Sequence, residues 1–468
     1  MFDQVRWPWR PWIGIAAGLW WLYAAADVGP GFFVFASLFA LPMSGGAVAI
    51  ALGQHDLRAN QTWALGSALA TALALPCGFA IGFGPAVALA LASAASWVLA
   101  GREAIEAEPV DPRMPAPERS LGNGAKAALD ETFLGVEQFM VRLPVGDELA
   151  AMHDEIVDAV AIFEDRGWSA DPTTYHTPPP RLDDVTHTSK RAGRRHYEHI
   201  VFESGYEPHR EEPGRARYLA LTAPRTGHAW LRVHPGEDRP WLICNNGYRL
   251  GHAPLDVAIF GDLHDRLGLN LLIPVLPMHG PRRIGRMSGD GWFTGHPLDT
   301  VHAVAQAQWD IRRLIGWLRH ERGATQIGTV GLSLGGYTTS LLAGLETGLS
   351  CAIPGIGVSC FASIIRRHSP SRQWAALRHI GVDEELLKRV FRPISPLAVE
   401  PLVPYDGRFL FGAVADRLVP PEHILALHQH WEEPEIVWHQ GGHMTAPVDP
   451  RVLATTEMTL RTTKLCPY

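Results

Sequence analysis

The chain is short of charge, of basic surplus and of paired cysteines. Of its 468 residues, 47% are hydrophobic and 19% are charged, so it is too apolar to be disordered and long enough for more than one folded unit. Its 41 Lys and Arg face 48 Asp and Glu, which argues against a protein that binds nucleic acid by neutralising phosphates. The 5 cysteines are scattered and form no CxxC pair, so neither a disulfide scaffold nor a thiolate zinc site is indicated.

Charged residues are nearly absent from the N-terminal part of the chain. Between Trp12 and Gly101 the only ones are Asp27, Asp56 and Arg58. Two Gly/Pro interruptions and one polar stretch divide this segment into four apolar runs, several of them near the lower limit of about 17 residues for a membrane-crossing helix. The runs lie at about residues 12–26, 32–52, 62–81 and 85–101. We therefore predict a transmembrane helical region of about four spans over residues 1–102.

The basic residues that flank these runs indicate an orientation. With four spans they all fall on one side of the membrane, and the positive-inside rule then makes both termini cytoplasmic. These residues are Arg6, Arg10, Arg58, Arg102, Arg113 and Arg119. Three spans would reverse the side of the following domain. A cleavable secretion signal and a soluble layer of buried helices are the alternatives to membrane spans.

The pattern changes twice beyond residue 102. Residues 103–195 form a connecting region, with a proline-rich linker followed by helices expected at 124–141 and 146–166. From about residue 196, short apolar runs alternate with longer amphipathic ones, which is typical of a mostly parallel sheet flanked by helices. The expected strands are 196–203, 217–223, 229–233, 241–245, 271–276, 326–330, 351–358, 408–414 and 435–439. The expected helices include 253–267, 300–322 and 337–346.

One GxSxG motif, residues 331–335, joins an expected strand to an expected helix. The glycines permit a turn so tight that Ser333 would have strained backbone and an exposed hydroxyl at the carboxyl end of its strand. Open α/β sheets place their ligands at that edge. An ordinary glycine-rich turn is the structural alternative, but the context favours a nucleophile.

A serine nucleophile needs a histidine to take its proton and a carboxylate to orient that histidine. Asp416 follows one expected strand and His443 follows the next, after Gly441 and Gly442, in the chain order Ser, Asp, His. His439 competes with His443 but falls within its strand. Asp406 and Glu400 compete with Asp416, which could also serve as a helix cap. Acyl transfer also needs oxyanion donors, and we expect the backbone N–H groups of Leu334 and Tyr248 to supply them.

These motifs resemble the α/β-hydrolase superfamily over residues 196–460. The resemblance rests on the GLSLGG elbow, the NNGY turn, ADRLVPPEH around the acid and GGHM around the histidine, and Asn246 departs from the His that many relatives carry. It implies an α/β-hydrolase fold, a catalytic domain over 196–468 and an esterase-like or lipase-like serine hydrolase without a cofactor. It also implies that the insertion at about 361–404 is a cap over the pocket, with simple packing against the core as the alternative.

The motifs indicate the type of reaction more closely than they indicate the substrate. His279 and Arg282 follow the end of an expected strand and are candidates for binding a substrate carboxylate or phosphate, with a solvated basic loop as the alternative. No metal-ligand or phosphate-loop pattern is present. We expect a membrane-anchored hydrolase of carboxylic esters, acting on a small-molecule or lipid-like substrate. A thioesterase or peptidase of the same fold and a non-catalytic membrane scaffold are the alternatives.

Overall fold

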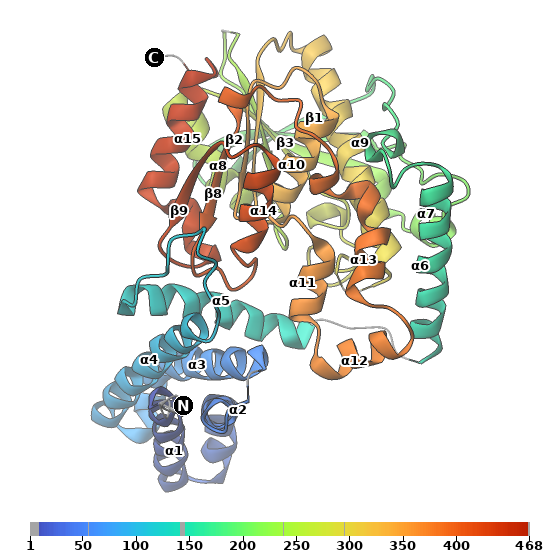
Figure 1. The fold of residues 1–468 in the computed structure, drawn as a ribbon. Helices are drawn as coiled ribbons and strands as arrows, with labels where there is room; N and C mark the ends of the chain where they lie inside the picture. Colours follow the sequence, from blue (N-terminus) through green and yellow to red (C-terminus); the bar gives the residue numbers. More distant parts are fainter. Residues whose placement is uncertain (1–8, 55, 141–145, 237, 294, 467–468) are drawn as a thin grey trace. The chain divides into compact units, whose positions relative to one another are not determined.

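The computed structural model describes residues 9–54, 56–140, 146–236, 238–293 and 295–466 (Figure 1). Two compact units are present. The smaller contains the described residues of 1–141, 413–421 and 438–449, and the larger contains those of 142–412, 422–437 and 450–468. Arg6, used above for the orientation, and residue 141, the expected end of a helix, lie outside the described residues.

The larger unit is built on a mixed sheet. Within the described residues, the sheet has nine strands in the order β1-β2-β3-β5-β4-β6-β7-β8-β9. The strands are β1 Thr186–Ala192, β2 Arg195–Glu203, β3 Thr226–Arg232, β4 Trp241–Asn245, β5 Asn270–Val275, β6 Ile327–Leu332, β7 Ala352–Gly355, β8 Phe409–Ala413 and β9 Glu435–His439. β1, β2, β3 and β5 pair antiparallel, whereas β5, β4, β6, β7 and β8 pair in parallel. Helices cover both faces of the sheet (Figure 1). The predicted α/β-hydrolase fold is therefore confirmed.

The central strands form because they are mostly apolar. Every residue of β4, β5 and β6 is buried, as expected for parallel strands covered on both faces. The helices of this unit are α6 Asp147–Asp165, α7 Arg215–Leu219, α8 Ala253–Leu267, α9 Pro297–Glu321, α10 Leu334–Leu345, α11 Phe361–His368, α12 Ser371–His379, α13 Glu384–Val390, α14 Glu422–His430 and α15 Pro450–Thr462. Short 3-10 turns are η1 Pro172–Tyr175, η2 Ala223–Arg225, η3 Gly280–Arg282, η4 Arg392–Ile394, η5 Pro396–Ala398 and η6 Tyr405–Gly407.

Two strand assignments differ from expectation. The strand expected at 217–223 is wrong, because the chain forms helix α7 there. Gly214, at φ 75°, starts that helix, and the apparent alternation reflects the burial of Tyr218, whose hydroxyl donates to Gln306. Conversely, β1 was missed because its residues are exposed or half-buried, so no apolar alternation marks it. The sheet therefore begins at Thr186 rather than near residue 196.

The smaller unit begins with four described helices: α1 Arg10–Val28, α2 Pro30–Ala51, α3 Leu57–Ile81 and α4 Phe83–Glu106. Three of them, α2, α3 and α4, are long and apolar enough to cross a membrane. The glycines at the two tight turns, Gly29 and Gly82, have φ of 136° and 86°, which side chains rarely allow. α5 Leu121–Met140 follows, and the unit also holds the 3-10 turn η7 His443–Val448.

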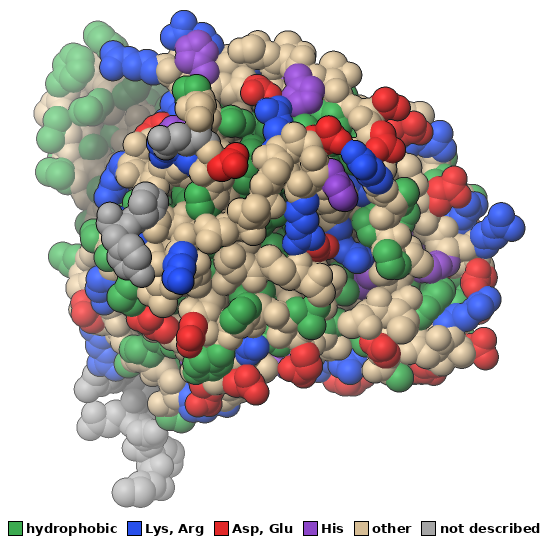
Figure 2. Space-filling model, turned by 90° about the horizontal axis from the view of Figure 1, so that it is seen from above, with side chains coloured by type: hydrophobic (Ala, Val, Ile, Leu, Met, Phe, Trp, Pro, Cys, Tyr) green, Lys and Arg blue, Asp and Glu red, His purple; other side chains and the backbone are tan. Residues whose placement is uncertain are grey.

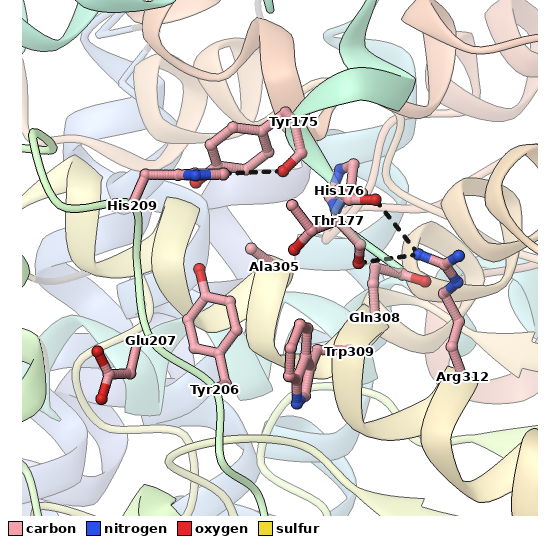
Figure 3. A pocket seen from close by; sticks show the side chains of 10 residues that line it. All are labelled: Tyr175, His176, Thr177, Tyr206, Glu207, His209, Ala305, Gln308, Trp309 and Arg312. Carbon is pink, nitrogen blue, oxygen red and sulfur yellow. Dashed lines mark hydrogen bonds between the residues drawn. The ribbon is translucent and has the colours of Figure 1, made fainter. Parts of the chain in front are cut away.

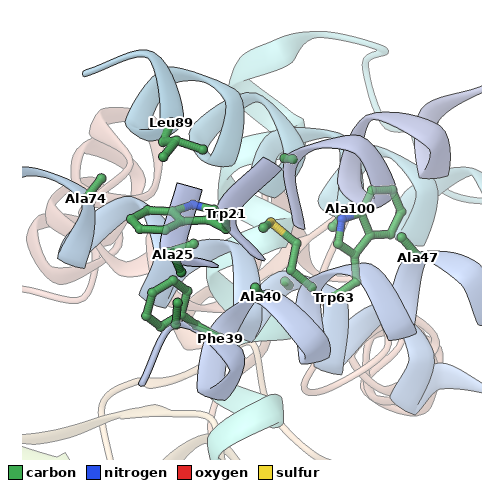
Figure 4. Close-up of a cluster of buried hydrophobic side chains, with 14 of the residues drawn as sticks. Trp21, Ala25, Phe39, Ala40, Ala47, Trp63, Ala74, Leu89 and Ala100 are labelled. Carbon is green, nitrogen blue, oxygen red and sulfur yellow. The ribbon is translucent and has the colours of Figure 1, made fainter. Parts of the chain in front are cut away.

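Small residues bring these helices close together. A side chain at Gly66 would meet the backbone N of Met43 at 2.3 Å, and one at Gly101 would meet the carbonyl O of Gly124 at 1.9 Å. Trp21 and Trp63 are fully buried and donate their indole N–H to serine hydroxyls of α4. Figure 4 shows both indoles inside the cluster. Because each indole has a polar partner, the bundle interior leaves neither N–H unsatisfied.

The outer faces of the same helices are apolar. Leu38 and Phe79, for example, are 67% and 88% exposed. Other exposed apolar side chains there include Leu19, Trp20, Tyr23, Val34, Leu41, Leu75 and Leu91. By contrast, the face of the molecule drawn in Figure 2 mixes basic, acidic, histidine and hydrophobic side chains, so no field of one sign dominates it.

Candidate functional site

Ser333 forms the turn between β6 and α10 in the larger unit. Its backbone has φ 60° and ψ −116°, a combination that non-glycine residues avoid. Its N–H donates to the carbonyl of Gly355 at 3.0 Å, and α10 begins at Leu334. The Leu334 N–H therefore belongs to the first turn of a helix, where backbone donors lack partners within the helix.

Glycines make this turn possible. A side chain at Gly335 would lie 1.9 Å from the carbonyl O of Asn245, and one at Gly331 would lie 2.0 Å from that of Gly335. At Gly336 the nearest atom would be the Cα of Gly357, 2.8 Å away. These obstacles are all backbone atoms, so the GLSLGG segment fits only because it carries no side chains there.

The turn after β4 lies beside the elbow. A side chain at Gly247 would lie 3.4 Å from the Cβ of Ser333. Asn245 anchors the start of the turn, donating from its amide to the hydroxyls of Thr329 and Thr339 at 3.1 and 2.9 Å. The backbone around Tyr248 is thus held near Ser333, and the role of its N–H as an oxyanion donor stays a prediction.

The two downstream residues form a close pair in the smaller unit. Nδ1 of His443 lies 2.6 Å from Oδ2 of Asp416, and both side chains are buried. Oδ1 of Asp416 accepts the backbone N–H groups of Leu418 and Val419 at 3.0 and 2.8 Å. Asp416 therefore caps its own loop while it holds the imidazole, so the two roles weighed above are compatible.

Neighbouring charges raise the pKa of the His443 imidazole. Burial by itself lowers the pKa of His443, but the charge and hydrogen bond of Asp416, together with the charge of Asp130, outweigh burial and raise it. A raised pKa makes His443 the stronger base once it has lost its proton.

His439, the competing histidine, has a carboxylate of its own. Its Nδ1 lies 2.5 Å from Oδ2 of Asp449 and its Nε2 lies 2.9 Å from the hydroxyl of Thr445. Because both ring nitrogens are engaged, His439 braces the loop that follows β9. The competing acids Asp406 and Glu400 are exposed.

Asp130, on α5, was missed by the sequence reasoning. It is fully buried, and its carboxylate accepts the backbone N–H of His443 at 2.7 Å. It lies 313 positions before His443 along the chain, and no motif marks it. A buried acid on a helix carries no recognisable signal until the structure shows what it meets.

A second serine and histidine, Ser363 and His423, also lie together in the larger unit. Nε2 of His423 is 3.2 Å from the hydroxyl of Ser363, while Nδ1 faces the backbone N–H groups of Ser359 and Cys360. Nδ1 must therefore be the acceptor, so the ring proton sits on Nε2. In that tautomer His423 donates to Ser363 and cannot take its proton.

His279 and Arg282 are both buried rather than part of a solvated loop. Nδ1 of His279 lies 2.9 Å from the carbonyl of Pro277, and burial lowers the pKa of this ring to about 4. Arg282 donates to the carbonyls of Val275 and Pro224 and to Oδ2 of Asp310. These contacts tie Arg282 to the core, and its role in substrate binding stays a prediction.

The insertion at 361–404 contributes rings next to the elbow helix. Phe361 stacks on Tyr337 with ring centroids 4.1 Å apart, and it also contacts Phe293 and Phe391. Phe293 in turn contacts Tyr248, from the turn after β4. The insertion is therefore joined to the core by aromatic packing.

A separate hollow of about 310 Å³, part of it open solvent, is shown in Figure 3. Its walls come from residues 175–177 and 206–209 and from α9. Some of the polar groups there pair with one another: Arg312 donates to the carbonyl of His176, and Nε2 of His209 lies 3.0 Å from the carbonyl of Tyr175. No elbow residue lines this hollow, so we give it no catalytic role. Among the described residues, no group of His, Cys, Asp and Glu is arranged to hold a metal ion.

Comparison of sequences places the chain among its relatives. Over 337 residues it is 42% identical to "Uncharacterized protein MT2702" of Mycobacterium tuberculosis strain CDC 1551 / Oshkosh. The same identity and length hold for "Uncharacterized protein Rv2627c" of strain ATCC 25618 / H37Rv. Both matches cover 71% of this chain and 80% of the relative. This chain belongs to their family. No protein-family model matches it.

Solved structures with a similar course of the chain include several hydrolases. The acetyl xylan esterase from Paenibacillus sp. R4 has a TM-score of 0.45 at 16% identity, over 66% of this chain and 95% of that one. The acylaminoacyl peptidase of Pyrococcus horikoshii has a TM-score of 0.36 at 15% identity, over 62% and 42%. The α/β-hydrolase GrgF from Penicillium sp. sh18 has a TM-score of 0.35 at 18% identity, over 51% and 93%.

Proposed function

We propose that this protein is a membrane-anchored serine hydrolase that cleaves carboxylic esters through an acyl-enzyme intermediate. Ser333 attacks the ester carbonyl, His443 takes the serine proton and then gives it to the leaving alcohol, and Asp416 orients His443. Water, activated by the same imidazole, then releases the acid. The backbone N–H groups of Leu334 and Tyr248 hold the oxyanion.

The strained backbone of Ser333 is the observation that carries this proposal. A non-glycine residue in such a sparsely populated conformation costs on the order of 1–3 kcal/mol, and residues of this kind cluster at active sites. An ordinary strand-to-helix turn with so many glycines could place one of them at that position instead. The Asp416–His443 pair adds independent support, because its imidazole already has the carboxylate that fixes the tautomer.

The membrane part of the proposal rests on the helices of the smaller unit. α2, α3 and α4 are long and apolar enough to span a bilayer, and apolar side chains cover their outward faces. A large exposed apolar surface is unfavourable in water and favourable in lipid. With α1 counted as a fourth span, the positive-inside rule places both ends of the chain on one side. We therefore propose an inner or plasma membrane location with the hydrolase domain in the cytoplasm. Anchoring favours a lipid-like ester as substrate, alongside small soluble esters.

The enzyme is tested with a fluorophosphonate probe on the full chain in detergent. Wild type should label, Ser333→Ala should not, and Ser363→Ala should label like wild type because His423 cannot activate Ser363. Equal labelling of wild type and Ser333→Ala would reject Ser333 as the nucleophile, and an unlabelled wild type would favour a non-catalytic scaffold. A panel of matched acyl esters, thioesters and amides then ranks esterase against thioesterase and peptidase.

The orientation is tested with reporters fused after residue 468. A reporter that works only in the cytoplasm should be active, and one that works only outside the membrane should be silent. The opposite result would place the hydrolase domain outside and reject an even number of spans. Extraction of the protein from membranes by alkaline carbonate without detergent would reject integral insertion.

A further inference from the structure

We propose that Asp130 is a positioning residue of this site: its carboxylate, presented by α5, fixes the two loops that carry Asp416 and His443. This inference rests on the function proposed above. It concerns only residues of the smaller unit, since α5 and both loops belong to it.

The contacts of Asp130 are with backbone. Oδ2 accepts the N–H of His443 at 2.7 Å and that of Arg417 at 3.1 Å, while Oδ1 accepts the N–H of Met444 at 3.1 Å. One carboxylate therefore bridges the residue after Asp416 and the histidine itself. Hydrogen bonds from backbone to a buried carboxylate are stronger than neutral ones, so this bridge limits how far either loop can move.

Glycines at positions 441 and 442 leave space for the Asp130 carboxylate and its helix. A side chain at Gly442 would lie 2.5 Å from Oδ2 of Asp130, and one at Gly441 would lie 2.4 Å from Cδ of Lys126. The two glycines before His443 therefore let α5 approach the backbone closely. Lys126 also donates to the carbonyl of Gln440 at 2.7 Å.

A neighbouring ion pair holds the acid loop on the same helix. Nε of Arg417 donates to Oε1 of Glu131 at 2.7 Å, and its Nη1 lies 2.8 Å from Oε2 of Glu108. Arg417 and Glu131 are 3% and 1% exposed. The backbone N–H of Arg417 thus bonds to Asp130, and the side chain of Arg417 bonds to Glu131. Two successive residues of α5 therefore hold the acid loop.

Asp130 also acts on the histidine through its charge. Burial and the charge of Asp416 raise the pKa of Asp130 to about 7, and the charge of Asp130 contributes to raising the pKa of His443. The charged and titratable groups on α5, on the two loops and on α4 with its continuation, besides Asp130, are Lys126, Glu131, Glu137, Asp416, Arg417, His439, His443, Asp449, Arg102, Glu103, Glu106 and Glu108. Of the carboxylates, Asp416 and Asp130 are the ones that raise the pKa of His443.

The test uses the full chain in detergent and two readouts that need no activity. Amide exchange of the peptides 413–421 and 440–448 reports how firmly the loops are held. Exchange of the Cε1 proton of His443, followed across pH by mass spectrometry, reports its pKa. Asp130→Asn should speed amide exchange in both peptides and lower the pKa of His443, because the charge of Asp130 helps to raise it. Its kcat for an ester should fall about tenfold or more, with KM changed less than about threefold.

Two variants serve as matched controls. Glu131→Gln removes a charge from the next residue of α5, so it should lower thermal stability but leave the pKa of His443 unchanged. Asp111→Asn removes a half-buried carboxylate of the same unit, one that pairs with Arg113, and should change neither readout. Asp130→Ala removes both acceptor oxygens, and with them all three hydrogen bonds, and should speed exchange more than Asp130→Asn.

The outcomes separate this inference from the proposed function. If wild type hydrolyses esters but Asp130→Asn keeps its amide exchange and the pKa of His443, the inference is overturned while the function stands. If wild type is inactive, faster exchange and a lower His443 pKa in Asp130→Asn still support the fixing of His443 by Asp130. If Glu131→Gln changed the amide exchange and the pKa of His443 as much as Asp130→Asn does, the effect of Asp130 would be one of general packing, and the inference would be overturned.

Discussion

Asp449 binds His439 through Nδ1 just as Asp416, from the loop after β8, binds His443, so two imidazole–carboxylate pairs anchor the loop that follows β9. The pairs differ at the second nitrogen. In His439 it meets the hydroxyl of Thr445, while in His443 it is the atom that we propose takes the proton of Ser333. His443→Gln should therefore lower kcat by about a thousandfold or more. His439→Gln should chiefly lower thermal stability, and a larger loss of kcat from His439→Gln would reverse the assignment.

The pH dependence of the reaction follows from the raised pKa of His443. Only the neutral imidazole accepts the serine proton, so kcat/KM should rise with pH and reach its midpoint above the ordinary histidine value of 6.5. Asp416→Asn removes the main cause of the shift, so the midpoint should move to lower pH while kcat falls by about 10⁴. A wild-type midpoint below 6.5 would contradict the electrostatics described for this pair.

Removing Arg417 should destabilise the smaller unit. Its guanidinium is buried between Glu131 and Glu108, so Arg417→Met leaves a buried carboxylate without its cation, at a cost of about 3–5 kcal/mol. Thermal unfolding in detergent measures the change. The control is Arg113→Met, which breaks an exposed pair with Asp111 and should leave the unfolding temperature nearly unchanged. Equal effects of the two variants would mean that the buried pair contributes nothing special.

The elbow should not tolerate a side chain at Gly335. A methyl group there would overlap the carbonyl O of Asn245, which is backbone and cannot rotate away. Gly335→Ala should therefore abolish probe labelling of Ser333 and lower the free energy of unfolding by about 2 kcal/mol or more. Gly316, within α9, has open space around it, and Gly316→Ala should stabilise the protein by about 0.5–1 kcal/mol. Normal labelling of Gly335→Ala would show that the turn adjusts.

Acid should weaken the larger unit through its buried histidines. Burial lowers the pKa of His279, His302 and His423 to about 4 in each case. The unfolded chain then binds more protons between pH 6.5 and 4, so this stability is fully present above pH 6.5 and falls as the pH drops through that window. Thermal unfolding at pH 7 and pH 5 measures the loss. His423→Gln should reduce the difference, and an unfolding temperature that rises on acidification would contradict this prediction.

A structural feature could be predicted from the sequence when the residues that determine it are close together in the chain. The elbow was predictable because the glycines, the strand and the helix that force Ser333 into its conformation are adjacent in the chain. The bounds of β9, Glu435–His439, were predicted correctly, since two glycines follow its apolar run within a few residues. The fully buried strands β4 to β6 follow from continuous apolar runs for the same reason.

Features set by distant partners were not predictable. β1 is recognised only by its pairing with β2, because its own side chains are polar. The burial of Arg282 depends on Asp310, on a helix that follows later in the chain. The helices expected at 62–81 and 85–101 are longer than expected, beginning at Leu57 and ending at Glu106, respectively. Their apolar runs continue into polar turns of helix, which the apolar pattern does not mark. Nothing in the sequence distinguishes Asp130 from other acidic residues on helices.

The close approach of α4 and α5 at Gly101 has a practical consequence for anyone who wishes to produce a water-soluble version. A shortened gene that starts at β1 would still encode Ser333, Asp416 and His443. It would delete the helix whose Asp130 fills the space beside Gly442, and that helix is seated on α4 through Gly101 and Gly124. Mutating the outward apolar side chains of α2, α3 and α4 to polar ones, with every helix retained, is therefore the sounder route to solubility.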